Sequence, residues 1–465
     1  MDYTKIFYVL ASVLFILGIK KLSHPKTARN GNFLAAVGML IAIVATLVSY
    51  DSIDFQMVII GMVIGAIIGS IFAQKVEMTQ MPQMVAIFNG FGGSASALIA
   101  AAEFLKLVSA EEFLKGEPID EFTLWTIIIS IFVGTLTFTG SFIAFGKLQG
   151  FISGQPIVFF GNQLLNALLA ILLLGLGFFT IDAPTEMNYF YGVILISAIL
   201  GITLTIPIGG ADMPVVISLL NSYSGIAAAA TGFVLMNNGL IIAGALVGAS
   251  GLILTNIMCK GMNRSLANVI FGAVGLEQET GTDGPQKQVA IKSYSTEEAA
   301  MIFDAAEKII VVPGYGLAVA QAQHAVREVA ELLEKKGKKV LYAIHPVAGR
   351  MPGHMNVLLA EANIPYEQLK DLDEINPEFE DCDVSLVLGA NDVVNPAARH
   401  DKSSPIFGMP ILDVDKSRTV IINKRTMNTG FAGIQNELFG YDNSIMVFGD
   451  AKDMLQQLLK DLKEL

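Results

Sequence analysis

The sequence is poor in cysteine, histidine and charge. Its 465 residues include only two cysteines, Cys259 and Cys382, which are too few for a disulfide framework or a cysteine-based metal site. We therefore expect two unpaired, buried thiols and no bound metal. Only 15% of the residues are charged and 53% are hydrophobic, values outside the usual range of soluble globular proteins. The scarcity of charge predicts a membrane domain.

The few charges are also unevenly distributed. Residues 1–275 carry 11 Lys and Arg against 13 Asp and Glu, whereas residues 276–465 carry 19 against 29, so the net charges are −2 and −10. Acidic charge spread over the second half argues against nucleic acid as a partner, because phosphate binding needs clustered cations. Composition thus separates an apolar first part from a polar second part.

Nine apolar segments have the length of a transmembrane helix, for which about 20 residues are needed. They are residues 5–20, 33–50, 56–74, 82–105, 123–146, 157–180, 189–209, 214–236 and 239–259. The first is expected to be retained as a span, because its flank has one lysine and no small-residue cleavage site follows. The sequence thus predicts nine transmembrane helices, and an odd number places the ends of the chain on opposite sides.

The loops between these segments indicate the orientation. On the side of the C-terminal half the basic residues are Lys20, Lys21, Lys26, Arg29, Lys75, Lys147, Lys260 and Arg264, and on the other side they are Lys5, Lys106 and Lys115. Cytoplasmic loops carry the excess of Lys and Arg, so the C-terminal half is predicted to face the cytoplasm.

Small residues recur in the spans. Gly61, Gly65 and Gly69 follow one another at four-residue spacing, and residues 222–232 are rich in Gly and Ala. Such patterns let helix backbones approach closely, so we expect helix packing, with a channel-lining role as the alternative.

A polar segment separates the spans from the rest of the chain. Residues 276–295 are polar, contain glycine and lack periodicity, which is typical of a linker. We place the transmembrane domain at 1–262, the linker at 263–295 and a third region at 296–465.

In this third region, apolar runs of strand type alternate with helical patterns. Strands are predicted at Lys308–Val312, Lys339–Ile344, Val384–Leu388, Pro410–Val414, Thr419–Asn423 and Ile445–Phe448, and helices at about 317–336, near 355–362 and from Ala451 onward. This order predicts an α/β domain with a doubly wound, Rossmann-like parallel sheet.

A turn with two glycines follows the first of these strands. Gly314 would permit a tight turn, Gly316 the close approach of a pyrophosphate, and the small Ala320 close packing of helix and sheet. The helix that follows would offer N–H groups to the phosphates. These features predict a dinucleotide site, with an ordinary glycine turn as the alternative.

Cations replace the acid that an NAD site would have. After the second strand, where an Asp or Glu would bind the ribose 2′-hydroxyl, the chain reads His345–Arg350. Lys424 and Arg425 end another strand, where they would bind a 2′-phosphate through charge-assisted hydrogen bonds. The sequence therefore favours NADP(H), with a solvated basic pair as the alternative.

Further loops at strand ends are residues 350–354, 389–392 and 429–433. The last is glycine-rich around an aromatic residue and is predicted to fold over the ligand as a lid. His345 and His354 are assigned structural or positioning roles, because hydride transfer between two nicotinamides needs no side-chain acid.

Several long motifs allow comparison with known families. They are Val76–Thr79, Thr137–Lys147, Gly209–Val216, Asn221–Gly225, Met258–Ser265, Pro313–Gln323, His345–Glu361, Gly389–Ala397 and Lys424–Gly433. Together they resemble the beta subunit of the bacterial proton-translocating NAD(P) transhydrogenase, over essentially the whole chain.

This resemblance implies a reversible, direct hydride transfer from NADPH to NAD⁺ that is coupled to proton movement, with no catalytic side chain. It places NADP(H) on this chain, in a reversed orientation, and NAD(H) on a partner alpha subunit that adds transmembrane helices. A dimer of this heteromeric unit in the bacterial inner membrane is expected.

The resemblance also implies site residues. Those expected at the cofactor are Gly314, Tyr315, Gly316, Val319, Ala320, Val347, Ala348, Gly349, Arg350, Met351, Pro352, Gly389, Ala390, Asn391, Asp392, Val393, Lys424, Arg425, Gly430, Phe431, Ala432, Asp450 and Ala451. For the proton path and its coupling, the resemblance implies Asp212, Arg264 and Ser265, and our own hypothesis adds Asn89, Ser141, Asn221 and Ser250. Asp212, Arg264 and Ser265 are the coupling residues of this set.

One position departs from the family pattern. Many relatives carry a histidine thought to relay the proton where this chain has Asn89, and the only histidine in residues 1–275 is His24, in a predicted loop. We hypothesise that the protonatable group belongs to the partner's spans, and that Asn89, Ser141, Asn221 and Ser250 hold a water chain beside it.

Two other functions remain open from the residues alone. One is a nucleotide-gated transporter or channel with a sensory NADP(H) domain. The other is the NADPH-binding subunit of a quinone or haem reductase, which the lack of intramembrane histidine pairs and of a cysteine cluster argues against.

Overall fold

The structure is a computed structural model that describes residues 3–49, 55–110, 113, 119–159, 161–262, 265–271, 291–350, 353–402, 404, 406–429 and 434–465. It divides into two compact units: the first comprises Met1–Asn256 and Leu266–Gly275, and the second comprises Ile257–Ser265, which includes the last turn of α10, and Leu276–Leu465. Within the predicted linker, residues 263–264 and 272–290 lie outside the described residues.

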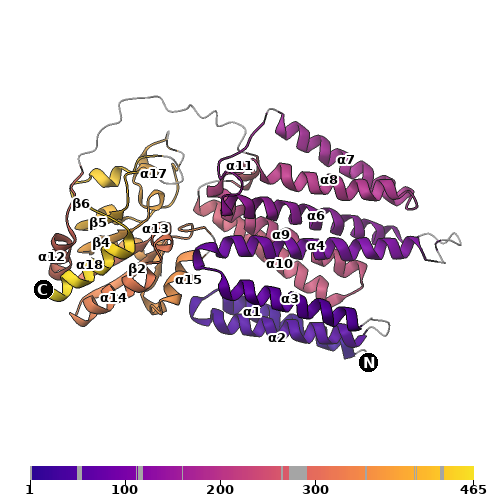
Figure 1. Cartoon of the computed structure of the whole chain (residues 1–465), viewed down its shortest axis with the longest axis horizontal. Coiled ribbons are helices and arrows are strands. Elements are labelled where there is room, and N and C mark those ends of the chain that lie inside the picture. Colours follow the sequence, from indigo (N-terminus) through magenta and orange to yellow (C-terminus); the bar gives the residue numbers. More distant parts are fainter. Residues whose placement is uncertain are drawn as a thin grey trace. The chain divides into compact units, whose positions relative to one another are not determined.

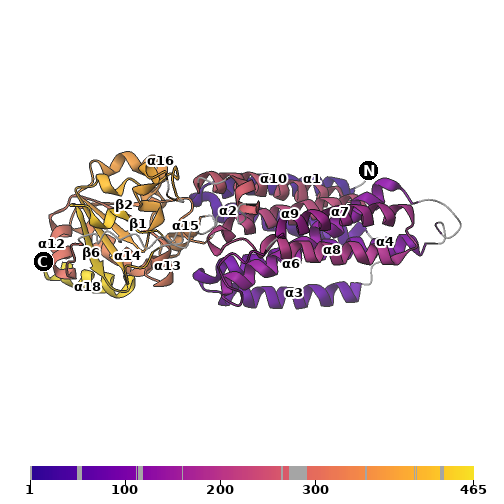
Figure 2. The same cartoon turned by 90° about the horizontal axis from the view of Figure 1, so that it is seen from above.

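The first unit is a bundle of long helices that run alongside one another (Figures 1 and 2). They are α1 (Tyr3–Leu22), α2 (Pro25–Ser49), α3 (Phe55–Lys75), α4 (Met81–Val108), α6 (Glu121–Gln149), α7 (Asn162–Asp182), α8 (Met187–Thr205), α9 (Met213–Val234) and α10 (Asn238–Gly261), with the short η1 (Met78–Gln80), η2 (Gly210–Asp212) and α11 (Leu266–Phe271).

Eight of these helices, α2 to α10, are long and apolar enough to cross a membrane, by the described residues alone. They confirm eight of the nine predicted spans. The remaining predicted span, residues 5–20, lies in α1, a helix of 20 residues with Lys20 and Lys21 in its last turn. The fold class of the first unit is therefore that of a multi-span helical membrane domain.

Glycines set the closest helix crossings. A Cβ atom on Gly93 of α4 would lie 2.7 Å from the carbonyl oxygen of Gly134 in α6, and a Cβ on Gly134 would lie 2.5 Å from that of Gly93. In the run 222–232, a Cβ on Gly225 of α9 would lie 2.4 Å from the backbone nitrogen of Gly248 in α10. The helix packing expected of that run is confirmed, because only glycine allows such approach.

The glycines of α3 behave differently. A Cβ on Gly61, Gly65 or Gly69 would meet no atom within 4 Å, and α3 has no buried residues in the part of the chain that the structure describes. Figure 2 shows α3 at the margin of the bundle. The stripe therefore meets no neighbour in the described part of this chain, and its role in helix packing stays a prediction, since small residues permit a close approach but do not supply a neighbour.

The second unit is an α/β domain with a six-stranded parallel sheet. Its strands are β1 (Lys308–Pro313), β2 (Lys339–Ile344), β3 (Leu369–Asp371), β4 (Val384–Leu388), β5 (Thr419–Lys424) and β6 (Ser444–Phe448). They lie in the order β3-β2-β1-β4-β5-β6, and every pair is parallel. This is the strand order of the dinucleotide-binding Rossmann fold, as predicted.

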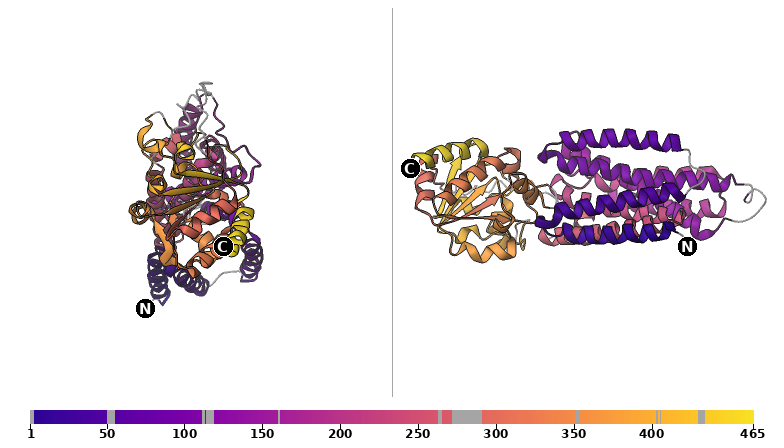
Figure 3. Two further views of the ribbon diagram at one scale, coloured as in Figure 1. Left: turned by 90° about the vertical axis from the view of Figure 1, so that its left-hand side faces the viewer. Right: turned by 90° about the horizontal axis from the view of Figure 1, so that it is seen from below.

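Helices and short turns connect the strands. They are α12 (Thr296–Ala305), α13 (Tyr315–Val319), α14 (Gln323–Lys335), α15 (His354–Glu361), η3 (Tyr366–Gln368), α16 (Leu372–Ile375), η4 (Asn376–Phe379), η5 (Asp392–Val394), α17 (Ala397–His400), η6 (Val414–Lys416), η7 (Glu437–Gly440) and α18 (Ala451–Glu464). Helix α18 packs against both α12 and α14, and Figure 3 gives two further views of this unit.

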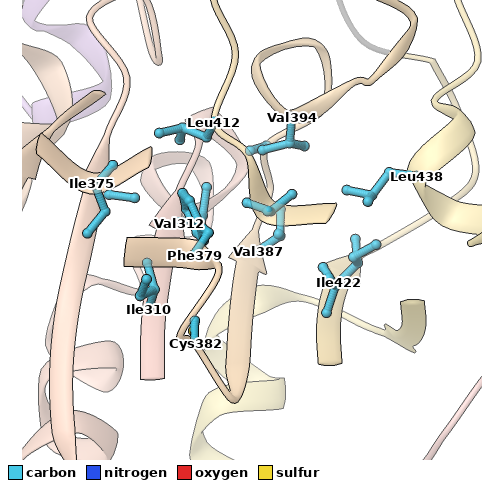
Figure 4. Close-up of a cluster of buried hydrophobic side chains, with 14 of the residues drawn as sticks. Ile310, Val312, Ile375, Phe379, Cys382, Val387, Val394, Leu412, Ile422 and Leu438 are labelled. Carbon is cyan, nitrogen blue, oxygen red and sulfur yellow. The ribbon is translucent and has the colours of Figure 1, made fainter. Parts of the chain in front are cut away.

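A buried apolar cluster covers one face of the sheet (Figure 4). Ile310 and Val312 of β1, which alternate along the strand, join Val387 of β4 and Ile422 of β5 in it. Phe379 of η4 packs onto these side chains from outside the sheet, together with Ile375, Leu412 and Leu438. The central strands are buried along both faces, so a shift by one residue would transfer these side chains to the opposite packed layer and disrupt both.

The helix predicted at 317–336 is divided in two. Gln321 has a φ of 49°, in the left-handed region, and the N–H of Ala322 donates to the carbonyl of Leu317. This turn interrupts the helical hydrogen-bond ladder between α13 and α14. The prediction of one continuous helix is therefore wrong, and α13 has only 5 residues.

The strand predicted at Pro410–Val414 is also absent from the described sheet. Its backbone groups are bound elsewhere: Asn376 Nδ2 donates to the Ile411 carbonyl (3.0 Å), the Asp413 N–H donates to Asn376 Oδ1 (3.1 Å), and the Leu412 N–H donates to the Val393 carbonyl (3.0 Å). The short β3, which the sequence did not predict, occupies the edge position instead.

The sheet gains a further contact from residues ahead of α12. Ser293 forms an isolated parallel bridge with Met446 of β6, and the N–H of Tyr294 donates to the Met446 carbonyl (2.9 Å). Folded structure in the second unit thus begins before residue 296.

Candidate functional site

The carboxyl ends of β1 and β4 define the centre of the candidate site. In this strand order the chain connections diverge between these two neighbours, and ligands of such folds bind in the crevice outside the strand ends at that point. Gly314 follows β1, and Gly389 follows β4.

The two glycine turns lie in direct contact. A Cβ on Gly314 would lie 2.4 Å from the Ala390 nitrogen, and a Cβ on Gly316 would lie 2.6 Å from the Gly389 Cα. The N–H of Gly316 donates to the Gly389 carbonyl (3.0 Å), and Gly389 has a φ of +65°. The glycines therefore allow the backbones of the two loops to pack against each other. The Gly316 N–H donates its hydrogen bond within the protein, to the Gly389 carbonyl.

Tyr315, Arg350 and His354 form a cluster beside this contact. The guanidinium carbon of Arg350 lies 4.4 Å from the centre of the Tyr315 ring, a cation–π arrangement, and the Tyr315 and His354 ring centres are 6.2 Å apart. The main-chain N–H of Arg350 donates to His354 Nδ1 (3.0 Å). A Cβ on Gly349, whose φ is +106°, would lie 2.5 Å from the same nitrogen, so glycine is required there.

His354 is buried and neutral. Burial, reinforced by the positive charge of Arg350, lowers its pKa from 6.5 to about 4. Because Nδ1 accepts a hydrogen bond, the proton of the neutral ring lies on Nε2, which has no partner among the described residues. A buried N–H without a partner is costly, and a ligand oxygen would relieve that cost.

His345 uses both ring nitrogens within the protein. Nδ1 accepts from the Val347 N–H (3.3 Å), so Nε2 carries the proton and donates to the Pro410 carbonyl (2.8 Å). Burial lowers its pKa from 6.5 to about 4. His345 thus holds the loop after β2 against the segment that begins at Pro410.

Lys424 joins the ends of β4 and β5. Its Nζ donates to Asn391 Oδ1 (3.4 Å) and to the Asn428 carbonyl (2.8 Å), and it lies 4.7 Å from the centre of the Phe439 ring. Burial lowers the pKa of Lys424, and the negative charge of Asp392 opposes this shift. Asn391 Nδ2 in turn donates to Asp392 Oδ1 (3.1 Å).

The end of β6 completes this edge. Asp450 accepts from the Lys452 N–H (3.0 Å) as the N-cap of α18, and the Gly449 N–H donates to the Lys424 carbonyl (3.1 Å). Ala451 is buried in the first turn of α18.

The structure therefore places predicted residues at five strand ends, those of β1, β2, β4, β5 and β6. Ala348 and Ala390 are buried, Val347, Gly349, Ala320 and Val393 are partly buried, and Val319 and Arg425 are exposed. Met351, Pro352, Gly430, Phe431, Ala432 and Arg264 lie outside the described residues.

Two asparagines at this edge were not among the site residues predicted from the sequence. Asn436 Nδ2 donates to the Asn391 carbonyl (2.9 Å), and Asn423 Nδ2 donates to the Val447 carbonyl (3.1 Å) and the Gly449 carbonyl (3.2 Å). Asn423 ends a predicted strand, which is the one signal that pointed to it.

A polar seam runs between α4, α6 and α9 in the first unit. Asn89 Nδ2 donates to Ser141 Oγ (3.1 Å), and Ser224 Oγ donates to Asn89 Oδ1 (2.6 Å). A second group of contacts lies about two helical turns further along α4, at Ser96. The hydroxyls of Ser130 in α6 and Thr231 in α9 are 2.7 Å apart, and each lies within hydrogen-bond distance of the Ser96 carbonyl. We call these six residues the polar seam.

The other predicted membrane residues lie elsewhere. Asn221 is exposed, and Ser250 is exposed with its hydroxyl bonded to the Val247 carbonyl of its own helix (3.2 Å). Asp212 is buried where α9 begins, and Ser265 is exposed. Only Asn89 and Ser141 of the predicted proton path meet, and Ser224, which the sequence did not single out, joins them.

A multi-span helical unit together with a Rossmann-type domain that has glycine turns at its switch point defines a membrane protein with a dinucleotide-binding type of domain. The family model of the NAD(P) transhydrogenase beta subunit matches residues 4–461. The NAD(P) transhydrogenase subunit beta of Rhodospirillum rubrum is 52% identical over 456 residues, covering 97% of each chain, and the same subunit from a strain of that species matches equally.

The chain belongs to the NAD(P) transhydrogenase beta subunit family. It is part of a proton-translocating transhydrogenase, a membrane protein that binds a nicotinamide nucleotide and works with an alpha subunit.

Proposed function

We propose that this chain binds NADP(H) at the carboxyl edge of its sheet and exchanges hydride with NAD(H) held by the partner alpha subunit. The overall reaction is NADPH and NAD⁺ to NADP⁺ and NADH, in either direction. The observation that carries the proposal is the cluster of Lys424, Asn391 and Asp392 at the switch point, together with the absence of an acid directly after β2.

The residues present fit this nucleotide. Glycines at 314, 316 and 389 let the turns after β1 and β4 pack backbone to backbone, and His354 Nε2 is a buried donor without a described partner. Lys424 offers a desolvated positive charge, and Arg425 beside it is exposed. Cations here would bind a 2′-phosphate, which distinguishes NADP(H) from NAD(H).

The bound nucleotide supplies the chemistry, since its nicotinamide carries the hydride. This chain's own residues bind and orient it. Val347, Ala348, Gly349 and Arg350 contribute from the loop after β2, and Asp450 and Ala451 shape the end of β6. Met351, Pro352, Gly430, Phe431 and Ala432, also predicted at the cofactor, lie outside the described residues. No side chain is required to transfer a proton in the hydride step.

In the membrane unit, we infer that Asn89, Ser141 and Ser224 line the proton path. Their amide and hydroxyl groups bind water but do not hold a proton at neutral pH, so the protonatable group belongs to the partner's spans. Asn221 and Ser250, being exposed, would contribute from outside the polar seam, where partner helices pack.

Coupling requires an element with two states that both sites bias. We propose that protonation in the membrane alternates the NADP(H) domain between an occluded state and one exposed to the NAD(H) site, through Asp212, Arg264 and Ser265. The nucleotide domain would lie in the cytoplasm, on the bacterial inner membrane, in a dimer of the heteromeric unit.

The experiment is nucleotide titration of the full complex with Lys424→Met. NADPH affinity is expected to fall about 10- to 100-fold, because the substitution removes a charge-assisted hydrogen bond to the nucleotide. NADH affinity is expected to stay unchanged. Lys335→Met, at an exposed lysine in the last turn of α14, is the matched control. Equal weakening of both nucleotides, or of neither, would overturn the assignment.

A further inference from the structure

Lys147 is a buried cation in an apolar unit. It lies in the last turn of α6 and is 4% exposed, and it is the only buried Lys or Arg among the described residues. Its sequence position predicted a loop lysine that merely marks the cytoplasmic side. Ionisable groups inside a membrane domain are costly and usually serve a function, so its burial requires an explanation.

Every hydrogen-bond partner of this ammonium in the described chain is a main-chain carbonyl. Nζ donates to Ile206 (2.6 Å), Ile208 (2.8 Å) and Gln155 (3.2 Å). An ammonium has three N–H donors, and three carbonyl oxygens receive them. The charge is thus held in place by fixed dipoles.

These carbonyls belong to the joint between α8 and α9. Ile206 is the C-cap residue of α8, where carbonyls lack helical partners and carry partial negative charge. The same Ile206 oxygen accepts from the Ile157 N–H (3.3 Å), and the Gly210 N–H donates to the Gly154 carbonyl (2.7 Å). Lys147 and residues 154–157 therefore hold Ile206–Gly210, the segment that leads into Asp212 and α9.

Through this joint, Lys147 links α6 to the start of α9, and both are helices of the polar seam. Helix α6 carries Ser141 and Ser130 as well as Lys147, and α9 carries Ser224 and Thr231. A shift of the start of α9 relative to α6 would have to break or exchange the bonds of Lys147. A neutral donor would also satisfy these carbonyls. Its hydrogen bonds would be weaker than those of the charged ammonium, so such a shift would cost less free energy.

We propose that Lys147 is a positioning residue for coupling, which fixes the start of α9, and with it Asp212, relative to the seam residues of α6. This inference rests on the proposed role of the seam and of Asp212. Without the ammonium, hydride transfer continues while its link to proton movement is loosened.

The test compares Lys147→Met with Lys75→Met in the full alpha–beta complex, reconstituted in vesicles. Lys75 is a matched lysine, exposed in the last turn of α3. Hydride transfer, proton uptake and NADPH affinity are measured per assembled complex. Lys147→Met is expected to lower the protons moved per hydride about tenfold, while NADPH affinity changes less than about twofold. Lys75→Met should match the wild type.

Two further variants separate positioning from general damage. Lys147→Arg keeps the charge and should retain part of the coupling. Gly210→Ala places a Cβ 3.3 Å from the Gly154 carbonyl and should loosen coupling without touching the lysine. If Lys147→Met assembles and keeps the wild-type ratio, the proposal is wrong. If Lys147→Met does not assemble, the proposal is overturned when Lys147→Arg and Gly210→Ala both keep the wild-type number of protons moved per hydride. Loss of hydride transfer in the wild type would instead contradict the proposed function.

Discussion

The two units of this chain build polar clusters from different side chains. At the sheet edge, Lys424 and Asp392 are ionisable groups that each contact Asn391, and the ionisable Arg350 contacts the neutral His354. In the polar seam, the side chains that interact are the amide of Asn89 and the hydroxyls of Ser141, Ser224, Ser130 and Thr231, none of which is an acid or a base at neutral pH. The sheet edge holds charge, as a nucleotide phosphate requires, whereas the seam can guide a proton but has no group to store one.

The strongest test of this difference concerns the stored proton. Replacing the partner's intramembrane protonatable group should abolish proton pumping, because the seam supplies no substitute. Asn89→His in this chain should then restore part of it, since a titratable ring would enter the seam at a site already bonded to Ser141. Proton uptake in vesicles measures both, and pumping that survives the partner's change would contradict the division of roles.

At the sheet edge, the glycine contact is the most sensitive feature. Gly314→Ala would place a Cβ 2.4 Å from backbone atoms of Gly389 and Ala390, which cannot move independently of β4. We expect a loss of about 3 kcal/mol of stability and of NADPH binding, measured by thermal unfolding and titration of the complex. Gly337→Ala, where a Cβ meets no atom within 4 Å, should cost only about 1 kcal/mol through its positive φ of +84°.

The neutral histidines predict an acid-sensitive nucleotide unit. The pKa values of His345 and His354 are lowered from 6.5 to about 4, so the unfolded chain binds protons that the folded chain does not. Stability is therefore complete above pH 6.5 and falls as the pH drops towards 4, by up to about 3 kcal/mol for each ring.

Unfolding of the complex followed across this pH range should show the loss. His354→Asn should flatten the slope by about half, while His324→Asn, at an exposed position of α14, should leave it unchanged. A slope that is the same in all three proteins would contradict the burial argument.

The smallest expected effect is at the cap of α18. Asp450→Ala removes the acceptor of the Lys452 N–H and should cost about 1 kcal/mol. Asp450→Asn keeps an acceptor oxygen and should restore most of the loss in thermal unfolding. A larger effect on NADPH affinity than on stability would show that Asp450 contacts the nucleotide.

The sheet was largely predictable because its central strands are continuous apolar runs. Residues 339–344 and 384–388 were predicted with their observed bounds, β2 and β4. The apolar segment at Pro410–Val414 was not distinguishable from a strand, since what keeps it out of the sheet is the side chain of Asn376, distant in sequence. Leu369–Asp371 has too few residues to give a strand pattern, yet it pairs with β2.

The candidate site was predictable where residues follow strands, as Gly314, Gly389 and Lys424 do. Ser224 and Asn436 were not, because their roles depend on which distant residue packs against them. The small-residue patterns illustrate the same limit: residues 222–232 have a neighbour in α10, and Gly61, Gly65 and Gly69 meet none within 4 Å.

The bridge between Ser293 and Met446 has a mechanical consequence. The chain arriving from the membrane unit is fastened to β6 before the first helix of the nucleotide unit begins. Ser293 lies beside Met446, and three residues after Met446 the N–H of Gly449 is bonded to the carbonyl of Lys424. A displacement of the backbone ahead of α12 would therefore be transmitted through β6 to Lys424, the residue that carries the positive charge at this edge of the sheet.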